Sequence, residues 1–320
     1  MQDIQKPIAA EMAALACSVQ AWLQSDVHLL EASIQHCFKV PGKQMRPMSV
    51  FLVAGACGGI TEATHRGAML VTLLHQAALV HDDVVDGASR RRGQPTINTA
   101  WSNKVAVLLG DYLLVKSLRL AIQHSDHYFL EFMTETAQIM SEGELLQLGH
   151  AQRVDFSEET YLDIIYKKTA HLWGACFAIG VVATKRSCAQ VNIMRQAGEY
   201  TGMAFQIQDD ILDYGPHDTG KQIGIDLREG KRTLPLIYAL QHATAPVRTQ
   251  MSRIIQAPQK AARQQQMMLD FVRTSGGIEY AQRAASRYRQ KALAILSELP
   301  NTPYKEALLA LVAYAADREV

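Results

Sequence analysis

Apolar residues recur along the chain at spacings of three and four, which is the period of one face of an α-helix. Near the N-terminus the residues that follow this pattern are Ile8, Met12, Leu15, Val19, Trp22 and Leu23. Near the C-terminus they are Leu308, Leu309, Val312 and Ala315. Alternating runs typical of β-strands are absent over any useful length. The pattern therefore predicts an all-α protein.

Most of the ten prolines fall between the periodic stretches rather than inside them. They are Pro41, Pro47, Pro95, Pro216, Pro235, Pro246, Pro258, Pro300 and Pro303. Because proline ends or kinks a helix, this placement divides the chain into about a dozen helices. No Ser/Gly-rich or low-complexity segment marks a boundary, so we expect residues 1–320 to form a single domain around a buried central cavity.

Composition narrows the class of protein. The chain has 320 residues, is 48% hydrophobic and carries a net charge of +1, which allows a sizeable core and argues against a nucleic-acid partner. Its five cysteines form no CxxC pair, as in a reduced cytoplasmic protein. The N-terminus does not resemble a signal peptide, and the apolar stretches 69–80 and 172–184 are too short or interrupted to span a bilayer. We expect a soluble cytoplasmic protein without a transmembrane segment.

Two aspartate clusters share one spacing. They are Asp82, Asp83 and Asp86, and Asp209, Asp210 and Asp213. Each places carboxylates at i, i+1 and i+4, so the first and last share a helix face and the middle one lies beside them. Neighbouring anions repel one another, and a divalent cation, best magnesium, relieves that repulsion. Solvated acidic helix ends are the alternative, but the repeat within apolar sequence favours two helices that clamp a polyphosphate through bridging metals.

Basic residues that can bind phosphate lie near the first cluster. Arg90, Arg91 and Arg92 follow it by a few residues, and guanidinium groups bind phosphate through paired hydrogen bonds. A basic turn without function is the alternative. Lys43 and Arg46 lie near a predicted helix start, where phosphate binding is physically easy, although this motif alone is weak.

Two histidines lie on the predicted helix of the first cluster. His75 precedes Asp82 by about two turns on the same face, so we favour a phosphate contact over the more common core histidine. His81 projects to a different side and is expected to be structural. A polar patch at 142–147 interrupts another apolar helix. It predicts no role beyond helix packing or a hydrogen-bond network.

A second group of polar residues accompanies the second cluster. Gln206 precedes Asp209 by about one turn and can donate to the same ligand. Lys168 follows a long helical stretch, and Lys221 and Lys231 are loop lysines that can fold over a bound phosphate.

Taken in order, the motifs resemble those of the trans-isoprenyl diphosphate synthases (polyprenyl synthetases), most of all long-chain members such as octaprenyl and heptaprenyl diphosphate synthases. They are GKxxRP at 42–47, HDDVVD at 81–86, RRG at 91–93, GD at 110–111, KTA at 168–170, FQIQDDILD at 205–213 and the Gly/Lys segment at 220–235. The resemblance implies a bundle of roughly a dozen helices around a deep cavity. It also implies a homodimer and about three magnesium ions per active site, with manganese as a substitute.

The resemblance assigns roles by position. The metal ligands are Asp82, Asp86 and Asp209, and the catalytic set is Asp82, Asp83, Asp86, Lys168, Asp209, Asp210 and Asp213. The isopentenyl diphosphate contacts are Lys43, Arg46, His75 and Arg92. The allylic diphosphate contacts are Arg91, Lys168, Thr169, Gln206, Lys221 and Lys231. The departures from the family pattern, Pro41, Thr72 and Gly87, remove none of these ligands.

Residues before the first cluster bear on product length. Ala77 and Ala78, with Leu74 a turn further, line the expected path of the growing chain. In the family resembled, a bulky aromatic at these positions stops growth at short products, so two alanines favour a product longer than geranylgeranyl. Close helix packing is the alternative explanation of the alanines.

The implied activity is head-to-tail addition of isopentenyl diphosphate to an allylic diphosphate, with farnesyl or geranylgeranyl diphosphate as the expected primer. A short-chain farnesyl or geranylgeranyl diphosphate synthase is the main alternative. A class I terpene cyclase would not need the second cationic site, and an inactive regulatory subunit would have lost one cluster. A di-iron carboxylate bundle would need a repeated Glu-x-x-His, which this sequence lacks.

Overall fold

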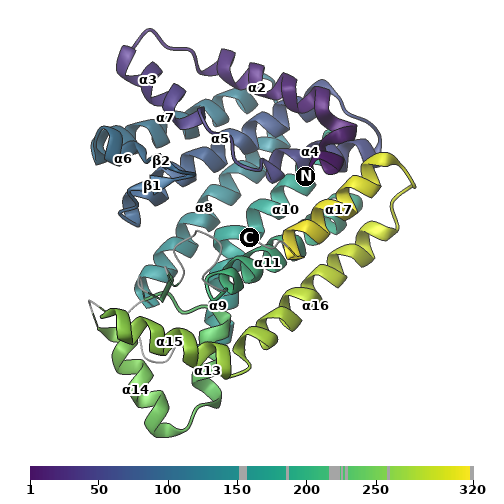
Figure 1. The fold of residues 1–320 in the computed structure, drawn as a ribbon. Helices are drawn as coiled ribbons and strands as arrows, with labels where there is room; N and C mark the ends of the chain where they lie inside the picture. The colour runs from purple at the N-terminus through teal and green to yellow at the C-terminus, as the bar shows by residue number, and fades with distance from the viewer. Residues whose placement is uncertain are drawn as a thin grey trace. The chain divides into compact units, whose positions relative to one another are not determined.

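The computed structural model describes residues 1–150, 157–184, 187–215, 224, 226–227, 230–257 and 260–317. This part of the chain is almost entirely helical, which confirms the all-α prediction (Figure 1). The chain divides into two compact units. Unit 1 comprises Met1–Ala137, Ala175–Arg195 and Leu299–Leu311, and unit 2 comprises Gln138–Gly174, Gln196–Glu298 and Val312–Val320. The single domain and its central cavity remain predictions.

Unit 1 contains the N-terminal helices and one small hairpin. Its elements are α1 (Gln2–Gln5), the 3-10 turn η1 (Lys6–Ile8), α2 (Ala9–Leu23), α3 (His28–Phe38), α4 (Met45–Cys57), α5 (Glu62–Val85), β1 (Arg90–Arg91), β2 (Gln94–Pro95), α6 (Ile97–Ala100) and α7 (Asn103–Gln123). Four helices contribute residues to both units: α8 (His127–His150), α10 (His171–Val182), α11 (Cys188–Leu212) and α17 (Pro303–Asp317).

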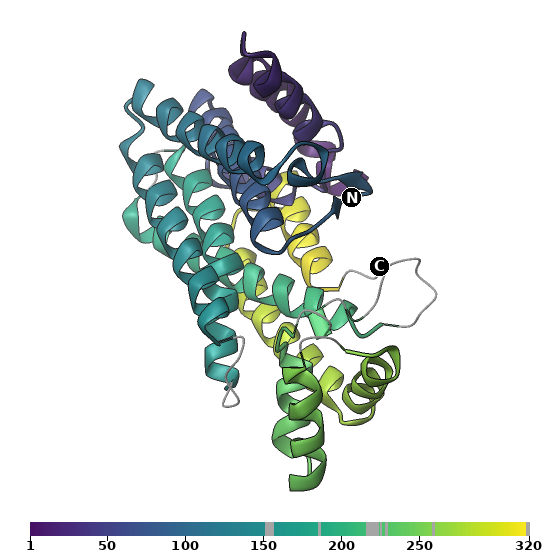
Figure 2. The ribbon, with the colours of Figure 1, turned by 90° about the vertical axis from the view of Figure 1, so that its left-hand side faces the viewer.

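The core of unit 1 forms where α5 packs against α4 and α7 (Figures 1 and 2). Phe51 of α4, Leu70 of α5 and Leu113 of α7 are fully buried there. Burial of each such side chain contributes about 1.5–3 kcal/mol to the hydrophobic stabilisation of the fold. Thr61 begins α5 with a capping box, because its hydroxyl accepts the Thr64 amide while the Thr64 hydroxyl accepts the Thr61 amide. The long helix that carries the first aspartate cluster is thus fixed at its N-terminus.

α5 is longer than the apolar stretch that the sequence suggested. It has 24 residues and a mean hydropathy of 1.2 over its most apolar window, so by length and composition it can cross a membrane. Half of that window is buried inside the structure. Core helices of soluble proteins have the same properties, so the absence of a transmembrane segment stays a prediction.

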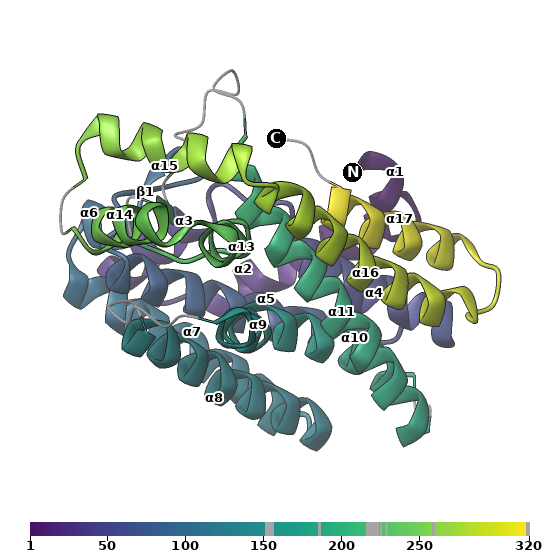
Figure 3. The same cartoon turned by 90° about the horizontal axis from the view of Figure 1, so that it is seen from below.

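Unit 2 contains the remaining helices, with α16 beside α13 (Figures 1 and 3). Its own elements are α9 (Glu158–Ile165), the π-helical turn η2 (Tyr166–Ala170), α13 (Leu234–His242), α14 (Ala245–Gln256), α15 (Ala262–Thr274) and α16 (Gly277–Ser297). One core cluster joins α9, α11, α13 and α16 through buried residues such as Tyr161, Ile207, Leu234 and Ala281. This cluster surrounds the turn and the helix end on which the second group of predicted residues lies.

Helix boundaries agree with the sequence pattern. Leu15, Val19 and Leu23 form the buried face of α2, and Leu308, Val312 and Ala315 that of α17. Pro235 and Pro246 stand in the first turns of α13 and α14, where proline costs no helical hydrogen bond. The predicted division of the chain by prolines is confirmed at these helix starts.

Candidate active site

The first aspartate cluster lies at the C-terminal end of α5. Asp82 is half-buried, Asp83 is buried, and Asp86 is the exposed residue that caps the helix. A helix C-terminus carries partial negative charge, so carboxylates placed there are destabilised unless a cation binds beside them. Asp82 and Asp86 therefore present oxygen ligands that suit a hard divalent cation.

Asp83 differs from its neighbours because its side chain turns inward. Its Oδ1 accepts a hydrogen bond from Arg91 Nε at 2.8 Å, and it is 4% exposed. Burial raises the pKa of Asp83, an effect that Arg91 opposes. Asp83 is expected to be catalytic, and in the structure it fixes the position of Arg91. Arg91, the expected contact of the allylic diphosphate, therefore has a carboxylate partner.

The arginines that follow the cluster form a hairpin, where the sequence predicted only a basic segment past the helix end. β1 and β2 pair antiparallel, with Arg91 opposite Gln94. Arg92 and Gly93 connect the strands with φ of 52° and 76°. Two successive residues with positive φ are typical of a type I′ turn, the connection that suits the twist of a two-residue hairpin. The turn points Arg91 and Arg92 in fixed directions.

Arg92 reaches the segment that begins α4. Its Nη1 donates to the Val40 carbonyl at 3.2 Å, and its guanidinium covers Gly42. A Cβ on Gly42 would lie 2.6 Å from the Arg92 Cζ, so the glycine leaves the space that the guanidinium fills. Lys43, the next residue, is exposed. The GKxxRP and RRG motifs, separated in sequence, are therefore in contact.

Arg46 and the neutral side chain of His75 complete this group in unit 1. Arg46 Nη1 lies 2.9 Å from His75 Nε2 and joins α4 to α5. Burial lowers the pKa of His75 well below its usual value, and Arg46 and Arg92 add to the effect. The structure thus brings together Arg46, His75 and Arg92, three of the four residues expected to bind isopentenyl diphosphate, and the fourth, Lys43, directly follows Gly42, which Arg92 covers.

Two further predictions concern α5. His81 Nε2 lies 3.1 Å from the Val107 carbonyl, and a Cβ on Gly110 would collide with its ring, so His81 is a packing residue as expected. Of the expected chain-length residues, Leu74 and Ala77 are buried and Ala78 is half-buried.

The second aspartate cluster lies at the C-terminal end of α11, in unit 2. Asp209 is exposed, Asp210 is buried and Asp213 is half-buried. Asp213 Oδ2 accepts the Asp226 amide at 3.1 Å, and Asp226 in turn lies 3.5 Å from Lys231 Nζ. Asp213 therefore helps to anchor the segment that carries Lys231. Lys221 lies outside the described residues.

Asp210 belongs to a hydrogen-bonded chain of four side chains. It accepts from Tyr161 Oη at 2.6 Å and from Gln206 Nε2 at 2.8 Å, while Gln206 Oε1 accepts from Thr169 Oγ1 at 2.8 Å. Burial, followed by the charge of Asp226, raises the pKa of Asp210 to about 8. Asp210 thus orients Gln206 and Thr169, two expected contacts of the allylic diphosphate.

Sequence reasoning missed four residues that hold this helix end. Tyr161 of α9 anchors Asp210. Tyr214 Oη lies 2.5 Å from Thr233 Oγ1, and Arg273 of α15 donates to the Tyr214 and Gly215 carbonyls at the end of α11. Thr233 lies inside a recognised motif, but Tyr161 and Arg273 are distant in sequence and carry no local signal.

Lys168 and Thr169 lie on η2. π-Helical turns are rare and are found frequently at functional sites. A Cβ on Gly202 of α11 would lie 2.5 Å from the Ala170 Cα, so the glycine allows α11 to approach this turn. Lys168 Nζ lies 2.5 Å from Glu144 Oε2 and donates to Gln147 Oε1 at 3.0 Å. The polar patch on α8 thus has partners that the sequence did not reveal.

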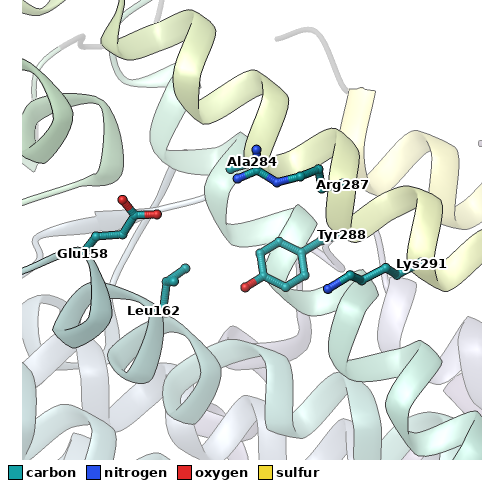
Figure 4. Close-up of a pocket in the computed structure, with 6 residues that line it drawn as sticks. All are labelled: Glu158, Leu162, Ala284, Arg287, Tyr288 and Lys291. Carbon is teal, nitrogen blue, oxygen red and sulfur yellow. The ribbon is translucent and has the colours of Figure 1, made fainter.

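A surface pocket lies elsewhere in unit 2, between α9 and α16 (Figure 4). Its lining residues are Glu158, Leu162, Ala284, Arg287, Tyr288 and Lys291. None of them belongs to the predicted site. Both oxygens of Glu158 lie 2.8 Å from Tyr280 Oη, so this carboxylate already has a partner in the fold.

The expected metal ligands fit a magnesium ion that also binds substrate. Within the described residues, no three His, Cys, Asp or Glu side chains converge closely enough to hold a metal by themselves. Each cluster instead offers one or two accessible carboxylates, and magnesium is commonly held by one or two carboxylates together with substrate phosphates and water. The donor set suits a hard cation that arrives with a diphosphate.

An all-α fold with acidic helix ends and adjacent cations is typical of a metal-dependent enzyme that binds diphosphates. The chain belongs to the polyprenyl synthetase family, whose model matches residues 27–271. The octaprenyl diphosphate synthase of Escherichia coli is 34% identical over 321 residues, covering 100% of this chain and 99% of that protein. The all-trans-nonaprenyl-diphosphate synthase (geranyl-diphosphate specific) of Rhodobacter capsulatus is 38% identical over 322 residues, covering 99% and 98%.

A solved structure is similar over the whole chain. The polyprenyl synthase from Caulobacter crescentus, crystallised with calcium and isoprenyl diphosphate, has a TM-score of 0.93 and 32% identity, covering 100% of this chain and 98% of that one. The predicted resemblance to long-chain synthases is therefore confirmed.

Proposed function

We propose that the protein is a trans-polyprenyl diphosphate synthase that adds isopentenyl diphosphate head-to-tail to an allylic diphosphate and makes an all-trans product longer than geranylgeranyl. The observation that carries this function is the repeat of an aspartate cluster at the C-terminal ends of α5 and α11, each with basic residues in the same unit. The full-length similarity to octaprenyl and nonaprenyl diphosphate synthases supports the long product.

In this proposal, two separate sets of residues bind the two diphosphate substrates. Lys43, Arg46, His75 and Arg92 bind isopentenyl diphosphate. Arg91, Lys168, Thr169, Gln206, Lys221 and Lys231 bind the allylic diphosphate. Asp82, Asp86 and Asp209 would hold magnesium, which would supply Lewis-acid neutralisation of the leaving diphosphate. Farnesyl or geranylgeranyl diphosphate is the primer in this proposal.

Each cycle breaks the allylic C–O bond and one C–H bond, and forms one C–C bond and one O–H bond on pyrophosphate. The allylic C–O bond breaks, and its electron pair leaves with pyrophosphate, whose charge Lys168 and Lys231 stabilise. The double bond of isopentenyl diphosphate, oriented by Arg46 and His75, supplies the electrons for the new C–C bond. Loss of a proton to pyrophosphate restores a double bond and leaves an allylic diphosphate longer by one isoprene unit. Apolar walls must exclude water, which would otherwise capture the cation.

A homodimer belongs to the same proposal. Three large apolar side chains spaced by seven residues, Leu108, Val115 and Ile122, lie along α7 with exposed fractions of 67%, 59% and 63%. A seven-residue repeat keeps them on one side of the helix, as in helices that pack against a second helix. Light scattering of wild type and Leu108→Glu tests this, with a dimer expected for wild type and a monomer for the variant.

Product analysis tests the activity. Purified protein, farnesyl diphosphate, isopentenyl diphosphate and magnesium should yield polyprenyl diphosphates, sized by mass spectrometry after dephosphorylation. Asp82→Ala and Asp209→Ala should each lower kcat by two orders of magnitude or more, because a charge-stabilising group at the reacting centre is worth about 3–4 kcal/mol. Asp270→Ala, an exposed carboxylate on α15, is the control.

Other outcomes identify the alternatives. A hydrocarbon formed without isopentenyl diphosphate would indicate a terpene cyclase, and inactivity alone would indicate a regulatory subunit. A main product of farnesyl or geranylgeranyl length would indicate a short-chain synthase. A folded Asp209→Ala protein with wild-type turnover at saturating magnesium would refute the role of the second cluster.

A further inference from the structure

The polar patch on α8 contacts the lysine of the KTA motif. Glu144 Oε2 lies 2.5 Å from Lys168 Nζ, and Gln147 Oε1 accepts from the same ammonium at 3.0 Å. The side chains of Lys168 and Glu144 are 25% and 17% exposed, so the pair is mostly shielded from water. Two acceptors on successive turns of one helix thus fix an otherwise flexible side chain.

The backbone reinforces this contact. A Cβ on Gly143 would lie 2.7 Å from the Lys167 Cβ, closer than real Cβ atoms lie to their neighbours, and a tight 3.1 Å from the Lys168 amide nitrogen. Gly143 therefore lets α8 approach η2 directly. Lys167, the preceding residue, has a separate partner, because its Nζ lies 3.5 Å from Glu142 Oε2. Neighbouring acids on α8 thus contact neighbouring lysines on the turn.

We propose that Glu144 and Gln147 are positioning residues that hold the Lys168 ammonium where it meets the allylic diphosphate. This proposal rests on the proposed function, in which Lys168 binds that diphosphate. A lysine has four rotatable bonds and a compact charge, so without support its ammonium samples many places. A small displacement of a binding group can lower the rate by about a hundredfold.

A purely electrostatic role of Glu144 makes the opposite prediction. If Glu144 only neutralised Lys168, its removal would increase positive charge and tighten diphosphate binding. Gln147 carries no charge, so its removal alters position without altering the field. Substitution of both residues, one at a time, therefore distinguishes a positioning role from charge neutralisation.

Steady-state kinetics with each substrate varied in turn test the proposal. Glu144→Gln and Gln147→Leu should each lower kcat/KM for farnesyl diphosphate by about tenfold or more, with the KM for isopentenyl diphosphate within twofold of wild type. Glu142→Gln, which removes the same charge from the same helix, should behave as wild type. A lower KM for farnesyl diphosphate in Glu144→Gln, or wild-type kinetics in Gln147→Leu, would overturn the proposal.

A double-mutant cycle shows whether the residues act through Lys168. In a Lys168→Ala background, Glu144→Gln should have no further effect on kcat/KM, because the group that it positions is gone. An equal loss in both backgrounds would show that Glu144 acts otherwise, as a structural residue would, and would overturn the proposal. Wild-type kinetics of Lys168→Ala itself would instead refute the role of Lys168 in the proposed function. Thermal unfolding identifies any variant that loses activity through misfolding. If Glu144→Gln misfolds, the kinetics of Gln147→Leu test the proposal instead.

Discussion

The Arg46 guanidinium donates a hydrogen bond to the imidazole of His75, with 2.9 Å between Nη1 and Nε2. A guanidinium has donors but no acceptor, so His75 Nε2 must be unprotonated and the ring neutral. Burial and the charges of Arg46, Arg92 and Arg91 act in the same direction, since all lower the pKa of His75. A histidine among three arginines is thus kept as an acceptor.

This pairing predicts a pH dependence of stability. Because the pKa of His75 is lower in the folded state than in the unfolded state, the unfolded chain binds more protons below about pH 6.5, and stability falls as pH falls. In His75→Gln the side-chain amide can still accept from Arg46 but does not titrate. Between pH 6.5 and 5.5, wild type should lose about 1 kcal/mol more unfolding free energy than the variant. Urea unfolding measures this, and parallel pH profiles would contradict it.

The bond from Tyr161 to Asp210 predicts a coupled loss of stability and activity. Tyr161→Phe removes a buried donor and leaves the Asp210 carboxyl with an unsatisfied oxygen, which should cost about 1–3 kcal/mol. Because Asp210 also orients Gln206, the KM for the allylic diphosphate should rise as well. Tyr280→Phe, whose hydroxyl binds Glu158 instead, should leave that KM unchanged. An unchanged KM for the allylic diphosphate in Tyr161→Phe would show that these hydrogen bonds do not contribute to substrate binding.

The division of cations between two diphosphates predicts different kinetic defects. Arg46→Ala should raise the KM for isopentenyl diphosphate by roughly tenfold, the effect of one lost charge-assisted hydrogen bond. Lys231→Ala should mainly impair use of the allylic substrate. Initial rates with each substrate varied in turn measure both. An Arg46→Ala effect confined to the allylic KM would refute the assignment.

Product length should respond to bulk on α5. Ala78 is half-buried whereas Ala77 is 2% exposed, so a ring is accommodated more easily at position 78. Ala78→Phe should remain folded and active while its main product shortens by several isoprene units, as shown by mass spectrometry. Ala77→Phe should shorten the product too, but with about 1–3 kcal/mol lost to overpacking. An active Ala78→Phe enzyme with the wild-type product range would place the length-determining residue elsewhere.

The helices and the exposed site residues could be predicted from sequence because both are local properties. A 3–4 apolar period located α2 and α17, and the i, i+4 spacing located Asp82 with Asp86 at one helix end. The same spacing could not distinguish Asp209 from Asp210. Asp209 is exposed, whereas Asp210 is buried and bonded to Tyr161, which is 49 residues away in the sequence.

Contacts between distant segments set the remaining features. Glu144 can be recognised in the sequence as a polar residue in an apolar helix. Its ion pair with Lys168 cannot, because the two residues are brought together only by the fold. The hairpin at Arg90–Pro95 was also missed, because two-residue strands are too short to show an alternating pattern. Tertiary pairing, rather than propensity, determines these details.

The guanidinium of Arg92 occupies the space that a side chain at Gly42 would need. A residue larger than glycine at position 42 would push the end of the flexible Arg92 side chain away from this place, even though position 42 carries no functional group. A neutral-looking substitution at Gly42 would therefore act as an indirect mutation of a phosphate-binding residue fifty positions away.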